Sequence, residues 1–306
     1  MSSVGDQSSK KIENIVLVGR TGNGKSATAN SLIGKKVFKS KASAAGVTKE
    51  CLPAETLTVD NHKIKVIDTP GLFDMSMAAN FIIKEIIKCL TLAEGGIDAV
   101  LLVFSARAPI TREEEKTLQT LKDLFGSQII DHVVIVFTGG DVLEENKETL
   151  DDFLARDCPE YIKEVIKLAG NRMVLFDNKT DDEHKKAAQV HELLSLIDKM
   201  RTNNGGAAYT DDLYHKIKAE LDELRQKEKD LEAGAKDSIS KIKEELQAEF
   251  QEKMNKMTAE MKKKMGDALE RQKKEFKEEE EKIIEINERF IKDLPPPKLN
   301  VICNIL

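Results

Sequence analysis

The side chains with the clearest chemistry stand close to the N-terminus. There, a complete phosphate-binding pattern GxxxxGK[ST] is spelled by Gly19-Arg20-Thr21-Gly22-Asn23-Gly24-Lys25-Ser26. The apolar run Ile15–Val18 precedes the pattern, and Ala27 carries the chain into a predicted helix. Its glycines let backbone N–H groups converge on phosphate oxygens, and a helix N-terminus favours negative charge. We therefore predict that residues 19–27 bind a nucleotide, with Lys25 on the outer phosphates and the Ser26 hydroxyl on Mg²⁺. The alternative is a glycine-rich turn without a ligand.

A second polar segment, Asp68-Thr69-Pro70-Gly71, follows an apolar run about 40 residues further along the chain. An Asp just past a strand can hold a water of Mg²⁺, and the Gly71 amide can contact the terminal phosphate. Between the two patterns, Thr48 can add its hydroxyl to Mg²⁺ and order its loop for catalysis. Ser40 in the same segment is assigned to the nucleotide site, and its hydroxyl is an alternative to that of Thr48. This spacing is typical of a GTPase with Mg²⁺ as cofactor.

Two further segments offer groups that read the base of a nucleotide. Thr138-Gly139-Gly140-Asp141 follows the run Val133–Phe137, where guanine-binding proteins carry [NT]KxD. The Asp141 carboxylate suits paired hydrogen bonds from the guanine N1–H and the exocyclic amine. Gly139 stands in place of the lysine that usually packs along the base. Asn178, after the run Met173–Phe176, offers an amide. Plain turns are the alternative reading of both segments.

These groups need a scaffold, and apolar strand-like runs alternate with amphipathic stretches between Ile12 and Thr202. The predicted strands are Asn14–Val18, Leu57–Val59, Lys63–Ile67, Ala99–Phe104, Val133–Phe137 and Met173–Phe176. The predicted helices are Lys25–Ile33, Phe81–Leu92, Arg112–Phe125, Thr149–Arg156, Pro159–Leu168 and Asp181–Arg201. The alternation predicts an α/β P-loop GTPase fold: a mainly parallel sheet, helices on both faces, and ligands at the carboxyl ends of the strands.

The composition changes along the chain. We expect a disordered lead-in at 1–11, a nucleotide-binding G domain at 12–202 and a linker at 203–208. The segment 209–294 is rich in Glu and Lys, and its apolar residues recur about every 3.7 positions, which predicts a long helix or a pair of helices. This tail forms an intermolecular coiled coil, stands alone in solvent, or folds back on the G domain. Residues 295–306 form a Pro-rich end.

Charge and cysteine content exclude several classes of protein. The net charge of −6, without a basic stripe, argues against a nucleic-acid partner. The four cysteines are widely spaced and form no CxxC pair, which argues against a disulfide framework or a zinc site. We find no signal-peptide core and no run near the ~18 apolar residues of a membrane span. We expect a protein of the cytoplasm or of the cytosolic face of an endomembrane.

The last residues, Cys303-Asn304-Ile305-Leu306, fit the C-a-a-X prenylation pattern, and a terminal Leu favours geranylgeranylation of Cys303. One lipid chain needs a second contribution for stable anchoring, and no polybasic segment supplies it. A dimer would carry two lipids on one particle and so reach a membrane surface. A chance match is the alternative.

Several segments together resemble the immune-associated nucleotide-binding GTPases of the avirulence-induced-gene type, especially plant members. They are GRTGNGKSATANSLIG, GVTKEC, IDTPGLFD, AVLLVFSARAPITREEEKTLQTLKDLFG, VVIVFTGGD and RMVLFDNKT. The resemblance covers about Lys11 to Arg201. It implies a septin-like and chloroplast-import-GTPase-like domain that binds GDP and GTP and forms homodimers across the nucleotide face. It also makes TGGD a plant-type variant of the base motif and favours Asn178 as the base contact.

Two departures bear on catalysis. Leu72 follows Asp-Thr-Pro-Gly where Ras-like enzymes keep a water-orienting Gln, so unaided GTP hydrolysis should be slow. Pro109-Ile110-Thr111 replaces the Arg-[Phe/Tyr]-Thr of the family box, so an arginine acting across a dimer would be Arg107 or Arg112. Either could instead be a surface charge at a helix cap. The sequence thus predicts a slow, dimer-activated, membrane-recruited GTPase, with a nucleotide-stabilised scaffold as the alternative. An ATPase is disfavoured by the guanine-reading groups.

Overall fold

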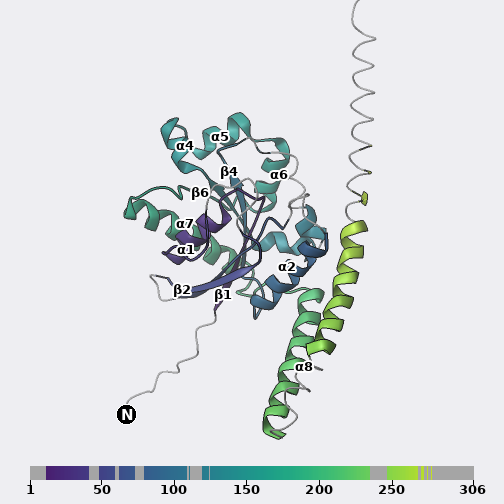
Figure 1. Ribbon diagram of the computed structural model, residues 1–306. Helices are drawn as coiled ribbons and strands as arrows, with labels where there is room; N and C mark the ends of the chain where they lie inside the picture. Colours follow the sequence, from purple (N-terminus) through teal and green to yellow (C-terminus); the bar gives the residue numbers. More distant parts are fainter. Residues whose placement is uncertain are drawn as a thin grey trace, which may run out of the picture.

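A mixed, mostly parallel sheet forms the centre of the computed structural model (Figure 1). The structure describes residues 12–40, 48–58, 62–72, 79–108, 110, 119–123, 125–234, 247–267, 270, 271, 274 and 277. The six strands lie in the order β2-β3-β1-β4-β5-β6, with β2 antiparallel to β3 and the other pairs parallel. They are β1 (Glu13–Val18), β2 (Leu52–Leu57), β3 (Lys63–Asp68), β4 (Ala99–Ser105), β5 (Val133–Thr138) and β6 (Met173–Phe176). The predicted α/β fold with a mainly parallel sheet is confirmed.

Helices cover both faces of this sheet, as the alternation predicts. They are α1 (Lys25–Ile33), α2 (Ala79–Leu92), α4 (Gly140–Glu145), α5 (Leu150–Asp157), α6 (Glu160–Leu168), α7 (Glu183–Asn203) and α8 (Asp212–Gly234), with a 3-10 helix η1 at Ser127–His132. Apolar residues of α1 and α7 pack on one face of the sheet, and those of α2, α5, α6 and α8 belong to the core on the other. Because both faces are covered, β4 and β5 are almost wholly buried and read as continuous apolar runs.

Among the described residues, the predicted strands and helices are confirmed except at the edge strand. The predicted strand Leu57–Val59 is wrong, because β2 occupies Leu52–Leu57 and pairs antiparallel at the edge of the sheet. Pro53 argued against a strand at this point of the sequence, because a proline has no N–H to donate. A proline is tolerated at the edge of a sheet, where that N–H would face no partner strand. The predicted helix Arg112–Phe125 lies largely outside the described residues, although 119–123 and 125 are helical. The short α4 and η1 were not predicted.

The helices at 212–234 and 247–267 fold back against the α2 side of the domain (Figure 1). After a turn at 204–206, Tyr209 forms an isolated bridge with Ile97, and α8 then packs on α2. Residues 247–267 form a second helix beside α8, running the opposite way, as the ion pairs Lys227–Glu249, Lys253–Glu220 and Lys216–Glu260 show. The described part of the tail is therefore a pair of helices that is folded back on the G domain, one of the alternatives left open by the sequence.

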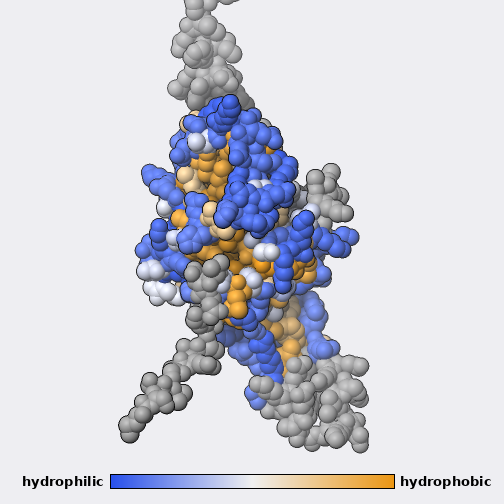
Figure 2. Space-filling model, turned by 90° about the vertical axis from the view of Figure 1, so that its left-hand side faces the viewer, coloured by the Kyte–Doolittle hydropathy of each residue, from blue (hydrophilic) through white to orange (hydrophobic). Residues whose placement is uncertain are grey.

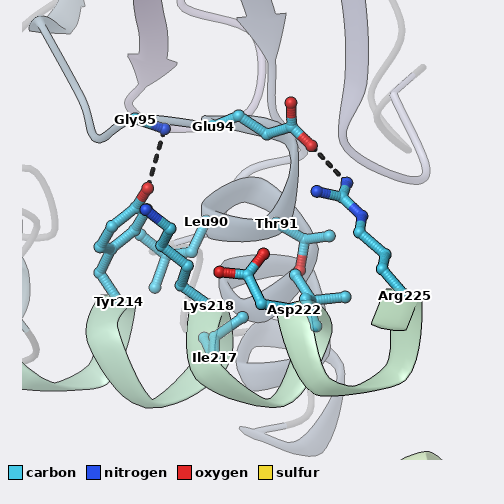
Figure 3. Close-up of a pocket in the computed structure, with 10 residues that line it drawn as sticks. Leu90, Thr91, Glu94, Gly95, Tyr214, Ile217, Lys218, Asp222 and Arg225 are labelled. Atoms are coloured by element: carbon cyan, nitrogen blue, oxygen red, sulfur yellow. Dashed lines mark hydrogen bonds and ion pairs between the residues drawn. The ribbon is translucent and has the colours of Figure 1, made fainter. Parts of the chain in front are cut away.

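Specific contacts hold α8 on α2. The backbone N–H of Gly95 donates to the Tyr214 hydroxyl at 2.8 Å, and Arg225 pairs with Glu94 (Figure 3). Between these two contacts lies a pocket whose apolar side chains include Leu90, Ile217 and Leu221. This pocket belongs to the helix interface and contains none of the phosphate-binding pattern.

The surface of the domain carries some apolar area. Figure 2 shows hydrophobic patches among hydrophilic residues on the face that lies to the left in Figure 1. The large apolar side chains that are exposed among the described residues include Leu52 and Leu57 of the edge strand β2, and Val37. In the part of the chain that the structure describes, no helix has the length and apolar character needed to cross a bilayer.

Candidate functional site

The phosphate-binding pattern forms the loop between β1 and α1, where two of its glycines are required by geometry. Gly19 has φ +145, and a Cβ on it would lie 2.5 Å from the Val103 carbonyl oxygen. Gly24 has φ +93 at the N-cap of α1, and its Cβ would lie 3.1 Å from the Thr138 side chain. A side chain at either position would be strained and would push the loop away from β4 or β5.

Two polar side chains fasten this loop to the sheet. The Asn23 amide donates to the Val103 carbonyl oxygen at 2.8 Å, and the Thr138 hydroxyl donates to the Asn23 carbonyl oxygen at 2.8 Å. Both side chains are buried. The loop shape is therefore held by the strands beneath it, and Thr138 connects it to the segment after β5 that is predicted to bind the base.

Lys25 is buried and turned back over the loop that precedes it. Its ammonium donates to the carbonyl oxygens of Gly19 at 2.8 Å and Arg20 at 3.0 Å. The loop thus holds a positive charge at the N-terminus of α1, whose backbone amides add partial positive charge. An anion at this helix end would meet both.

The three predicted metal-binding side chains meet in one cluster, although they come from three separate segments. The Ser26 hydroxyl donates to Asp68 Oδ2 at 2.6 Å, and the Thr48 hydroxyl lies 2.9 Å from Ser26 Oγ and donates to the same carboxylate oxygen at 3.2 Å. Asp68 is 1% exposed, and its other oxygen, Oδ1, has no hydrogen-bond partner among the described residues. Two hydroxyls and a carboxylate are the hard oxygen donors that Mg²⁺ prefers.

Burial governs the charge of this cluster. It raises the pKa of Asp68, while the hydrogen bond from Ser26 and the nearby Lys25 ammonium act in the opposite direction. A buried carboxylate with one unpaired oxygen is costly to keep charged unless a cation completes its surroundings. The donor set and the unpaired Oδ1 therefore fit a divalent cation.

The segment after Asp68 lies against the phosphate-binding loop. The Thr69 hydroxyl donates to the Leu17 carbonyl oxygen at 2.6 Å, which ties the end of β3 to β1. A Cβ on Gly71 would lie 2.2 Å from Thr21 Oγ1 and 3.1 Å from the Thr21 backbone nitrogen, so a side chain at 71 would require Thr21 to move. Leu72 is 3% exposed and belongs to the core shared with α2, so its side chain is turned away from solvent.

Two cations from other segments lie beside Asp141, the carboxylate that is predicted to bind the base. Arg107, just past β4, pairs with Asp141 Oδ1, and the Lys179 ammonium lies 3.3 Å from Oδ2. Burial of Asp141 raises its pKa, but the hydrogen bonds from Arg107 and Lys179 outweigh this effect and lower it below its ordinary value. Arg107, predicted as one candidate for an arginine acting across a dimer, is thus occupied within its own chain.

Asn178 is directed to α1. Its amide nitrogen donates to the Thr28 hydroxyl at 3.0 Å, and its amide oxygen accepts from the Ser31 hydroxyl at 2.8 Å. The neighbouring Asp177 shapes this loop. Its Oδ1 accepts from the backbone N–H groups of Lys179 and Thr180, at 2.9 and 3.0 Å. An Asp side chain that accepts hydrogen bonds from backbone N–H groups two and three residues further along stabilises a turn, and for this reason an Asp after a strand is a turn signal in a sequence.

The remaining predicted residues separate into two groups. Ser40 is exposed, and in the described part of the chain no hydrogen bond joins it to the cluster around Asp68. Ser26 and Ala27 follow Lys25 in the first turn of α1. Arg112 and Cys303 lie outside the described residues, as do the lead-in at 1–11 and the end at 295–306.

Comparison with known proteins gives the site a context. The model of the AIG1 family matches residues 13–228. Immune-associated nucleotide-binding protein 7 of Arabidopsis thaliana is 67% identical over 226 residues, which are 74% of this chain and 73% of that protein. Immune-associated nucleotide-binding protein 8 of the same plant is 56% identical over 222 residues, which are 72% of this chain and 63% of that protein.

Among solved structures, one of the chloroplast translocon components atToc33 and psToc159 is similar in fold. It has a TM-score of 0.51 and 22% identity, and the match covers 63% of this chain and 84% of that chain. Dimerization is important for the GTPase activity of those translocon components. At this identity the likeness supports the fold alone, a P-loop GTPase-like α/β domain.

Proposed function

Because this chain belongs to the AIG1 family, we propose that it binds guanine nucleotides and hydrolyses GTP slowly, with hydrolysis raised by dimerisation across the nucleotide face. The observation that carries the proposal is the cluster of Ser26, Thr48 and Asp68 beside Lys25. Three segments that are far apart in the sequence bring two hydroxyls and a carboxylate, donors of the kind that Mg²⁺ prefers, to the N-terminal end of α1, where a nucleotide's phosphates are favoured.

The proposed binding mode follows from these contacts. Lys25 would exchange its two carbonyl partners for the outer phosphates, and Gly71 would contact the terminal phosphate through its backbone. Mg²⁺ held by Ser26, Thr48 and Asp68 would neutralise charge on the phosphate oxygens. Asp141 would accept the guanine N1–H and exocyclic amine, with Thr138 and Asn178 closing the base end. A base that presents an acceptor at N1, as adenine does, would face the Asp141 carboxylate unfavourably.

The buried aliphatic side chain of Leu72 cannot orient water, so a single protomer should turn over slowly. A second protomer would have to supply the missing group, as the dependence of atToc33 and psToc159 on dimerization suggests by analogy. The alternative function is a scaffold that binds GTP as a structural ligand. Geranylgeranylation of Cys303 and recruitment to a membrane surface stay predictions of the sequence.

Nucleotide binding is tested first with Lys25→Ala. Removing a charged donor from phosphate should weaken fluorescent GDP or GTP binding by roughly tenfold or more. Lys35→Ala, which removes an exposed lysine just after α1, is the matched control and should bind as the native protein does. Equal affinities for the native protein and Lys25→Ala would refute the site.

Hydrolysis is tested by phosphate release at rising protein concentration, with particle size measured under GDP and a non-hydrolysable GTP analogue. For a dimer-activated enzyme, the rate per molecule rises as dimers form. A rate that stays near zero while dimers are present would favour the scaffold.

A further inference from the structure

Gly139 stands where the guanine-binding pattern [NT]KxD has a lysine. In the structure the cationic side chain of Arg107 lies beside this glycine. Gly139 has φ +93, and a Cβ built on it would lie 3.0 Å from Cγ of Arg107 and 3.4 Å from the Arg107 backbone nitrogen. The aliphatic part of Arg107 therefore lies directly against Gly139. Any larger residue at 139 would be strained in its own backbone and would displace this arginine.

The guanidinium of the same arginine reaches the carboxylate that is proposed to read the base. Arg107 pairs with Asp141 Oδ1, and Lys179 approaches Oδ2 at 3.3 Å. Side-chain exposure is 36% for Arg107 and 18% for Asp141. Among the described residues, each carboxylate oxygen thus has one cationic partner, and an ionised carboxylate has about four lone-pair sites in total. Two sites remain for a base that donates two hydrogen bonds.

We propose that Arg107 is a positioning residue for base recognition: it packs on Gly139 and orients Asp141, in place of the lysine of [NT]KxD. This inference rests on the proposed function, because it assumes that Asp141 reads guanine. It assigns Arg107 to the base end of its own nucleotide, and it differs from the sequence-based expectation of an arginine that acts across a dimer. The planar guanidinium suits this role because it holds a carboxylate in a fixed orientation.

The ion pair with Arg107 can either orient Asp141 or compete with the base for it. These two roles change the affinity for guanine nucleotide in opposite directions when Arg107 is removed. If Arg107 merely occupied Asp141 until a base displaced it, its removal would tighten guanine binding. If Arg107 oriented Asp141, its removal would weaken binding. An arginine that acted only on a partner's phosphates would change the turnover rate and leave the affinity for GDP unaltered.

The test measures dissociation constants for fluorescent GDP with native protein, Arg107→Ala and Arg107→Lys. Losing one charge-assisted contact should weaken binding by Arg107→Ala about tenfold, with Arg107→Lys between the two. Arg156→Ala is the matched control, because it removes an exposed arginine from a surface ion pair with Glu148. Inhibition by pyrophosphate, which has no base, should be equal in native protein and Arg107→Ala.

Coupling to Asp141 is measured in an Asp141→Asn background. An asparagine offers one donor and one acceptor, so it pairs with xanthine, whose C2 oxygen accepts where guanine donates. With xanthosine diphosphate as the ligand, adding Arg107→Ala should change the affinity less than about twofold, since the charged partner is gone.

The outcomes separate this inference from the function it builds on. Unchanged or tighter GDP binding by Arg107→Ala overturns it, and so does an equal loss of pyrophosphate and GDP. An undiminished Arg107→Ala effect in the Asp141→Asn background also overturns it. Failure of native protein to bind GDP, or indifference to Lys25→Ala, refutes the proposed function itself. If Arg107→Ala unfolds at a lower temperature than Arg156→Ala, the GDP affinity of Arg107→Lys is the deciding measurement. An affinity of Arg107→Lys equal to that of the native protein then overturns the inference.

Discussion

Ile217→Ala tests whether the helix after the predicted linker is part of the G domain. Ile217 lies on α8, beyond the 12–202 region that the sequence assigns to that domain. It is 1% exposed and belongs to the same apolar core as α2 and one face of the sheet. If α8 were an independent tail, this side chain would be in solvent, and its truncation would leave the stability of the domain unchanged.

The size of the effect follows from the burial. Truncating a buried Ile to Ala destabilises a protein by about 2–5 kcal/mol, and the value depends on how far the neighbours can close the gap. Ile217 borders a pocket that is also lined by Leu90 and Leu221, so these side chains have room to relax. We therefore expect the low end, about 2–3 kcal/mol. For a chain of this size, the melting temperature should fall by roughly 4–12 °C.

Thermal unfolding of the nucleotide-free protein, followed by circular dichroism, measures this change. The control is Lys218→Ala, which alters the neighbouring exposed residue of the same helix and should stay within about 0.5 kcal/mol of the native protein. A melting temperature of Ile217→Ala equal to that of Lys218→Ala would refute the docking of α8 on α2.

Two other predictions concern the loop and the core. Gly19→Ala should lower both melting temperature and GDP affinity more than Gly22→Ala, because a Cβ on Gly19 meets the Val103 carbonyl oxygen at 2.5 Å while one on Gly22 meets nothing within 4 Å. Equal effects would show that only backbone strain matters, since both glycines have positive φ. Burial lowers the pKa of His132 below 6.5, so the unfolded chain binds more protons and stability should fall as pH drops below about 6.5. His132→Gln should flatten melting temperature against pH between about 5 and 7, and an unchanged slope in this variant would refute the assignment.

The fold could be read from the sequence wherever one short segment carries a complete signal. Buried strands such as β4 and β5 appear as unbroken apolar runs, and α1 and β6 were predicted with their observed bounds. The edge strand β2 could not be found in this way. It alternates exposed and half-buried residues, contains Pro53, and is defined by its pairing with β3.

For the site as well, local motifs could be predicted from the sequence and contacts between distant segments could not. Local patterns predicted which residues could bind a metal, and the structure brings Ser26, Thr48 and Asp68 within hydrogen-bonding distance of one another. Pairings across the sheet had no local signal. Neither the link from Thr138 to the Asn23 carbonyl nor the attachment of Asn178 to Thr28 and Ser31 could be predicted, because each joins segments more than 100 residues apart.

Gly139 illustrates how such a pairing changes the meaning of a motif. In the sequence it is a missing lysine, and the natural inference is a weakened base site. In the structure Ser105 at the end of β4 pairs with Thr138 at the end of β5, so the residues that follow the two strands emerge side by side. Arg107 then lies against Gly139 and pairs with Asp141. A lysine side chain at 139 and this arginine compete for the same space, so the glycine and the arginine are best understood as one feature supplied by two strands.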